Sequence, residues 1–146
     1  MDVVVFIQVW ANCGHGDRYL ECVVDYVEIP ALQHFVLEDS YVLDVTREGD
    51  TVTIRMDLVY AKIHPELRPP REGEWAYVRE GELRFVGVSE FEWSNLSEPA
   101  TDADGSRSWD GLESFQQVDD TYTLEGDVGS IRVVARDLQV EMTGPA

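Results

Sequence analysis

The sequence has few cysteines, few basic residues and no long apolar run. Its two cysteines, Cys13 and Cys22, are too few for a disulfide scaffold. We expect two free thiols in a reducing compartment, with a single bridge as the alternative. No stretch approaches the ~20 apolar residues of a membrane span. The opening MDVVVFIQVW also lacks the positive start and the cleavage site of a signal peptide. We therefore expect a cytoplasmic protein that makes no contact with a membrane.

Basic residues are scarce, because 11 Lys and Arg stand against 29 Asp and Glu, for a net charge of −18. Such a charge disfavours binding to nucleic acid or to anionic membrane surfaces. It favours cations or a basic protein as the partner. The apolar share of 44% and the charged share of 27% are those of a globular chain rather than a disordered one. A length of 146 residues suits one domain with its own core.

Alternation of apolar and polar residues is the dominant pattern. In TVTIRMDLVY, Val52, Ile54, Met56 and Leu58 alternate with polar residues, which predicts a strand with one buried and one wet face. Glycine-containing turns suggest hairpins at residues 48–50, at 80–81 and at 126–129. In EWAYVR, before the second of these turns, the pattern places Trp75 and Tyr77 on one strand face. We predict antiparallel strands at 40–47, 51–60, 82–92, 130–136 and 137–143, and a further buried strand in the opening apolar run.

Helix signals are weak by comparison. PALQHFVLE, from Pro30, begins with a residue suited to a first helical turn, and WDGLESFQQ has Asp110 as a candidate cap. GDRYLECVVDYVEI is ambiguous, but its β-branched residues favour a strand. The proline-containing loop at 64–74 is excluded from a central strand. The fold class predicted is all-β, an antiparallel sandwich or barrel-like sheet of about eight strands with at most one or two short helices.

Three stretches resemble a family of small bacterial proteins of unknown function. They are FVLEDSYVLDV, HPELRPPREGEWAYVREGELRFVGVSEFEW and ATDADGSRSWDGLESFQQVDDTYTLEGDVGSIRVVA. The match runs from Phe35 to Glu141 and departs from the family pattern at Leu112, Glu113 and Val128. The resemblance implies one intact domain, residues 1–146, in which residues 1–30 are a lineage-specific extension or follow a start codon placed too far upstream. It implies no activity.

The stretch DADGSRSWDGLE, residues 102–113, raises the question of a calcium loop. Oxygen-bearing side chains fall where such a loop has them, and residues 98–127 hold nine acids and one base, 1 − 9 = −8. However, the sixth position is Arg107 instead of the required glycine, and flanking helices are not expected. We therefore favour a structural turn, with calcium as the possible cofactor if there is one. Its ligands would be Asp102, Asp104, Ser106, Asp110 and Glu113.

The same loop is the best candidate for a binding surface. Trp109 lies within it and off any alternating strand, so the ring is either an aromatic anchor for a partner or a cap that folds back on the sheet. Candidate binding residues are therefore Trp109, Asp102, Asp104, Asp110 and Glu113. A zinc site from Cys13, His15 and Cys22 lacks the close ligand pairs that zinc sites use.

No phosphate loop or nucleophile elbow occurs in the sequence. We predict a non-catalytic interaction module that binds a basic partner protein, with an immunity protein that neutralises a toxin as its most specific form. The alternative is a domain that binds a small ligand or a divalent cation through the 94–113 loop.

Overall fold

The computed structural model describes residues 23–96 and 98–145, and the predicted all-β class is confirmed. Eight of its strands have five residues or more: β2 (Phe35–Glu48), β3 (Thr51–Tyr60), β4 (Val78–Val86), β5 (Glu90–Ser94), β8 (Leu112–Val118), β9 (Thr121–Gly126), β10 (Gly129–Val134) and β11 (Asp137–Met142). The short elements are β1 (Val24–Asp25), a 3-10 turn η1 (Tyr26–Glu28), β6 (Ala100–Thr101) and β7 (Arg107–Ser108). The predictions for the opening apolar run and for both cysteines lie outside the described residues.

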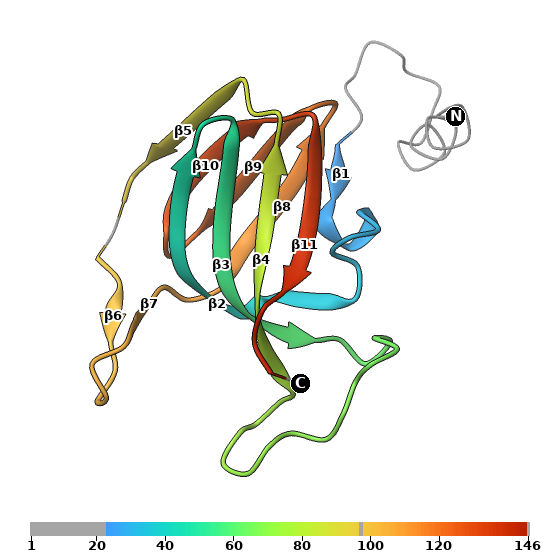
Figure 1. Cartoon of the computed structure of the whole chain (residues 1–146), viewed down its shortest axis with the longest axis vertical. Helices are drawn as coiled ribbons and strands as arrows, with labels where there is room; N and C mark the ends of the chain where they lie inside the picture. The colour runs from blue at the N-terminus through green and yellow to red at the C-terminus, as the bar shows by residue number, and fades with distance from the viewer. Residues whose placement is uncertain (1–22, 97, 146) are drawn as a thin grey trace.

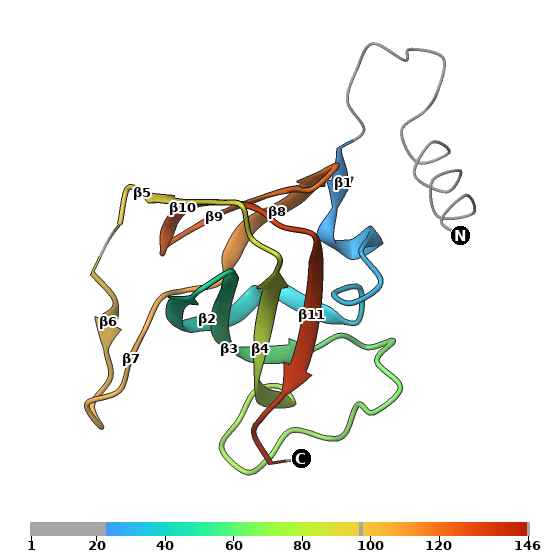
Figure 2. The ribbon, with the colours of Figure 1, turned by 45° about the horizontal axis from the view of Figure 1, so that its top comes forward.

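Two antiparallel sheets face each other (Figures 1 and 2). One has the order β11-β4-β3-β2 and the other the order β1-β8-β9-β10-β5, while β6 and β7 form a separate hairpin. The chain passes from one sheet to the other where β4 leads into β5 at Gly87, whose φ of 69° favours glycine. Near β2, Val42 and Trp109 exchange backbone hydrogen bonds of 3.0 and 2.8 Å. The arrangement is therefore a sandwich or barrel-like pair of sheets.

The core lies between the two sheets and follows the predicted alternation. Val52, Ile54, Met56 and Leu58 are all fully buried, which confirms the prediction for β3. The Phe85 ring on β4 contacts rings of the opposite sheet, with its centroid 5.0 Å from that of Tyr122. Burying one such side chain stabilises the fold by about 1.5–3 kcal/mol, so this interface holds the two sheets together.

The predicted hairpin at residues 80–81 is wrong, because β4 runs straight through both positions. Gly81 does not form a turn but allows close packing, because a Cβ there would lie 2.9 Å from Leu58 Cδ1. The hairpins at 48–50 and 126–129 are confirmed, with positive φ at Gly49 and Gly129.

Neither of the two segments with weak helix signals forms a helix. Residues 30–34 form turns, and the stretch 112–118 is strand β8. Leu112 and Phe115 are three residues apart, a helical spacing, yet both are buried in a strand. A register shift between Leu112 and Ser114 explains this, because the extra residue turns both side chains to one face.

Residues 24–29, which fall within the predicted extension, are an integral part of the fold. β1 pairs with β8, and Tyr26 is buried in the core. The Tyr26 hydroxyl donates to Glu38 Oε1 and accepts the Leu37 N–H at 3.2 Å. Burial, and then the bond to Glu38, raise the pKa of this phenol. The contacts fasten η1 to β2 and help to position the chain that enters the sheet.

Candidate functional site

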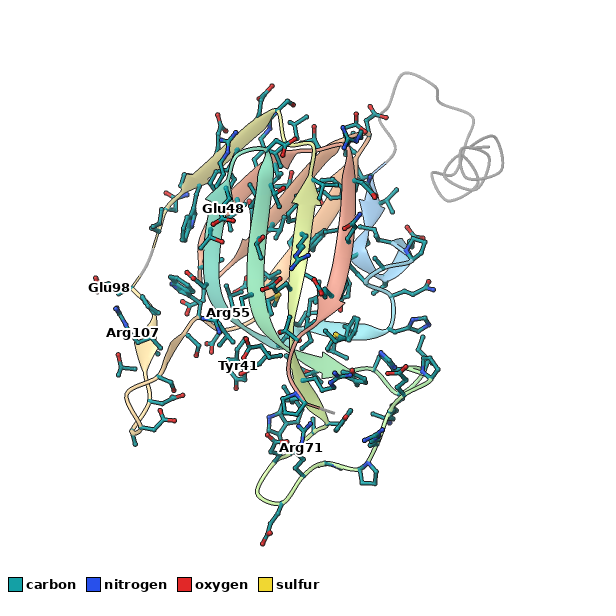
Figure 3. All side chains as sticks on the ribbon, in the orientation of Figure 1. Tyr41, Glu48, Arg55, Arg71, Glu98 and Arg107 are labelled. Atoms are coloured by element: carbon teal, nitrogen blue, oxygen red, sulfur yellow. The ribbon has the colours of Figure 1, made fainter. Side chains whose placement is uncertain are left out.

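The predicted acidic loop begins as a hairpin that stands away from the sheets (Figures 1 and 3). Its tip is closed by hydrogen bonds between its own residues. Asp104 Oδ1 accepts the Ser106 N–H at 2.9 Å and the Ser106 hydroxyl at 2.6 Å, and the Gly105 N–H donates to the Asp102 carbonyl at 2.9 Å. The bonds to Ser106 lower the pKa of Asp104. These are the contacts of a turn built by aspartate and serine side chains.

The other two predicted acidic site residues lie further along the chain. Asp110 follows the hairpin, and its N–H donates to Asp127 Oδ2 at 3.2 Å. Glu113 is exposed on β8. Within the described residues, no group of three or more His, Cys, Asp or Glu side chains is arranged to hold a metal ion. Asp102, Asp104, Asp110 and Glu113 are therefore not gathered into one site.

Trp109 is packed into the core and does not project from the loop as an anchor for a partner. Its side chain is 8% exposed, and its ring meets the Trp93 ring edge to face with centroids 6.0 Å apart. Its backbone forms the bridge to Val42 that joins the two sheets. Of the two roles considered for this ring, the geometry supports the cap on the sheet.

A larger acidic surface covers the outer face of β2, β3, β4 and β11. Paired residues on neighbouring strands point to the same side, so the register assigns its members. We call this the acidic sheet face; it carries Arg55, Arg84 and seven carboxylates, 2 − 7 = −5. Figure 3 shows Tyr41, Glu48 and Arg55 on it. The carboxylates are Asp44, Glu48, Asp57, Glu80, Glu82, Asp137 and Glu141.

Ion pairs neutralise only part of the acidic sheet face. Arg84 contacts Glu82 at 2.8 Å and Glu141 at 2.7 Å, and Arg55 contacts Glu80 at 3.2 Å. Asp57 lies directly opposite Glu80. Burial, and then the charge of Glu80, raise the pKa of the Asp57 carboxyl. The face therefore holds negative charge that the described part of the chain leaves uncompensated.

An open apolar groove of about 580 Å³ lies at the end of the same sheet. Its floor is formed by β2 and β3, and its wall by the loop 61–77 between β3 and β4. Ser40 shapes the floor: its hydroxyl donates to the Val36 carbonyl at 2.7 Å and accepts the Val59 N–H at 2.9 Å across an irregularity in the β2–β3 register. The apolar lining includes Val36, Val59, Leu67, Pro69, Pro70 and Trp75.

Contacts with the body of the fold hold the loop 61–77 in place. The His64 ring stacks on Tyr60 with centroids 4.0 Å apart, and its Nδ1 accepts the Glu66 N–H at 2.9 Å. Burial, and then the neighbouring His34, lower the pKa of His64. Arg71, labelled in Figure 3, donates to the Pro145 carbonyl at 2.8 Å, and its guanidinium lies 5.0 Å from the Tyr77 ring centroid. The groove is therefore formed before any ligand arrives.

The sequence reading missed this groove because it assigned Trp75 to a strand. β4 begins at Val78, and Trp75 stays in the loop with 64% of its surface exposed, while Tyr77 is buried. The signal was present in the chain: three prolines followed by a tryptophan make a loop that presents an aromatic ring.

No protein-family model, curated protein or solved structure matches this chain. The resemblance to a family of small bacterial proteins therefore stays a prediction. Within residues 23–96 and 98–145 there is no helix of the length and apolarity needed to cross a bilayer. The cytoplasmic location also stays a prediction.

Proposed function

We propose that this protein is a non-catalytic binding module that holds a basic partner protein on its acidic sheet face. The observation that carries the proposal is the pair Asp57 and Glu80, two carboxylates opposite each other on neighbouring strands of the sheet, with a raised pKa at Asp57. Like charges directly opposite on a sheet are destabilising. A partner that places a guanidinium or an ammonium group over the pair turns this repulsion into attraction.

The net charge of the chain supports the same proposal at longer range. A charge of −18 attracts a basic protein and speeds its approach. Tyr41, 39% exposed beside Asp57, adds the kind of aromatic surface that is common in protein interfaces. An immunity protein that neutralises a basic toxin is the most specific form of such a module.

A charge-matched pair of variants tests the proposal, with a nona-arginine peptide as the probe. The triple variant Asp44→Asn, Glu48→Gln, Asp57→Asn removes three carboxylates that have no ion pair among the described residues. We expect about tenfold weaker binding at 150 mM salt, since each exposed contact contributes ~0.2–1 kcal/mol. Amide chemical shifts should locate the peptide over β2, β3 and β4.

The control variant removes three charges from the β6–β7 hairpin and the residues before it, by Glu98→Gln, Asp102→Asn and Asp104→Asn. It has the same net charge as the first variant, so long-range attraction is matched. We expect its binding of the peptide to stay within about twofold of the wild type at 150 mM salt. At this ionic strength the attraction between exposed charges is largely screened beyond ~8 Å. Equal losses in both variants would show that net charge alone drives binding and would refute the acidic sheet face as the site.

A further inference from the structure

The lining of the groove beside the loop 61–77 has two basic residues and one acidic residue, whereas the chain as a whole has a net charge of −18. Ten basic residues lie in the described part of the chain, and seven of them have a side-chain hydrogen bond or ion pair. Lys62, Arg68 and Arg136 have no such contact there. Lys62 and Arg68 both line the groove, where Asp39 is the one carboxylate. Unneutralised cations therefore stand at the edge of an apolar surface.

Exposed apolar side chains gather on the same loop. Seven large apolar residues of the described chain are exposed, and Ile63, Leu67 and Trp75 belong to the loop 61–77. Leu67 and Trp75 line the groove. Tryptophan contributes strongly to the free energy of binding at protein interfaces, because it buries a large area while only two side-chain torsion angles lose their freedom. Such a ring, left 64% exposed beside a preformed groove, favours a polypeptide as the ligand.

The contacts of His64 and Arg71 described above reduce what binding must order. The loop is fastened to Tyr60 at one end and to Tyr77 and Pro145 at the other. A ligand that enters the groove therefore meets a fixed wall and not a loop that has to fold around it, and a preformed site loses less free energy to ordering.

We propose that this groove docks an extended segment of a partner polypeptide in which apolar side chains alternate with carboxylates. The apolar side chains lie against Leu67, Pro70 and Trp75, and the carboxylates pair with Lys62 and Arg68. This proposal is independent of the basic-partner proposal, because the groove and the acidic sheet face select opposite charges. At 150 mM salt the net charge of the chain is screened beyond ~8 Å. Within the groove, Lys62 and Arg68 outnumber the one carboxylate of the lining, Asp39, and so favour an acidic ligand.

Three synthetic nonapeptides test the proposal by isothermal titration calorimetry at 150 mM salt. In each peptide every second position is apolar, either leucine or phenylalanine. The positions between them are all glutamate in the first peptide, all glutamine in the second and all lysine in the third. We expect the glutamate peptide to bind and the lysine peptide to show no binding. Trp75→Ala should weaken binding of the glutamate peptide by about 30-fold, the effect of an interface hot spot. Lys62→Gln with Arg68→Gln should weaken it by about fivefold and leave the glutamine peptide unchanged.

Two matched controls use residues of the same type outside the groove lining. Ile63→Ala removes an even more exposed apolar side chain from the same loop, and Arg136→Gln removes the third cation without a side-chain partner. Neither should change binding of the glutamate peptide. Because Trp75, Lys62 and Arg68 are exposed, their variants should melt within about 1 °C of the wild type, in keeping with surface substitutions.

Specific outcomes would overturn the proposal. Failure of the glutamate peptide to bind at millimolar concentration would do so, as would equal binding of the lysine peptide. A wild-type dimer in sedimentation that Trp75→Ala dissociates would show that a second copy covers the groove, which also refutes it. Binding of nona-arginine by Trp75→Ala should equal that of the wild type, so the two proposals fail or succeed separately.

Discussion

Asp57 and Glu80 lie opposite each other on β3 and β4, so that two carboxylates are paired across the outer face of the sheet. Arg55 contacts Glu80 at 3.2 Å and forms no ion pair with Asp57. Burial and the charge of Glu80 together raise the pKa of Asp57. Ionised Asp57 therefore destabilises the folded protein at neutral pH, which is unusual for an aspartate and sets up the first prediction.

Asp57→Asn should stabilise the protein at pH 7 by about 0.2–1 kcal/mol, the order of one cross-strand side-chain interaction, because it removes a partly buried charge and its repulsion by Glu80. The folded-state pKa of Asp57 lies above its ordinary 3.8, so the stability that this group contributes is lost as pH rises from 3.8 through that raised value. Below pH 3.8 Asp57 is protonated in both the folded and the unfolded wild type. The free energies of unfolding of the wild type and Asp57→Asn, measured in urea, should therefore converge. Asp44→Asn is the control, because Asp44 faces Arg55 and should give no gain.

His64 should make the stability of the protein fall on mild acidification. Its folded-state pKa lies below 6.5, because burial and His34 disfavour the charged ring. The unfolded chain therefore binds the proton first, and stability is lost as pH falls from 6.5 to the lowered pKa, with no further loss from this group below it. His64→Phe keeps a ring against Tyr60 and should remove this part of the pH dependence in urea unfolding.

An NMR titration gives the direct check on His64. Its imidazole signals should titrate below 6.5, and protonation should break the bond from the Glu66 N–H to Nδ1. Shifts in Glu66 and Leu67 amides with the same midpoint would show that the loop 61–77 responds. A His64 titration at or above 6.5 would contradict the prediction.

Alternation along single strands was enough to predict most of the fold. Val52, Ile54, Met56 and Leu58 needed only a period of two, since a strand places every second side chain on one face. The pattern failed where tertiary contacts choose the conformation. Gly81 resembles a turn in sequence, but it is small because Leu58 packs against it from the next strand. Only the sheet register contains that information.

The candidate site was less predictable than the fold, because surfaces are assembled from residues far apart in sequence. Asp57, Glu80 and Glu141 come from three strands and meet on one face only through the sheet order. Local density of acids pointed instead to residues 98–127, where the charges spread over a hairpin and two further strands. Trp75 was misassigned for a different reason: the alternation in EWAYVR continues ahead of the strand, so alternation alone does not show that β4 starts at Val78.

Gly111→Ala should destabilise the protein more than Gly81→Ala. A Cβ at Gly111 would lie 2.2 Å from the Glu38 carbonyl oxygen, at the place where the chain before β8 meets β2. Backbone has to move there, whereas at Gly81 the nearest atom is a side-chain methyl. We expect about 1–3 kcal/mol for Gly81→Ala and a larger loss for Gly111→Ala in urea unfolding. The reverse order would contradict the tight approach of β2 to Gly111.

Trp109 and the aspartates of the β6–β7 hairpin should differ sharply in their effects on stability. Trp109→Ala removes a ring that packs on Trp93 beside the backbone bridge to Val42, and large-to-small core changes of this kind cost about 3–5 kcal/mol. Asp102→Asn is a surface change and should stay within about 0.5 kcal/mol. Thermal melting with and without calcium, at constant ionic strength, measures both effects. If Trp109→Ala melts like the wild type, the ring does not hold the two sheets together. If calcium raises the melting temperature of the wild type but not that of Asp102→Asn, the hairpin carboxylates bind the ion in solution.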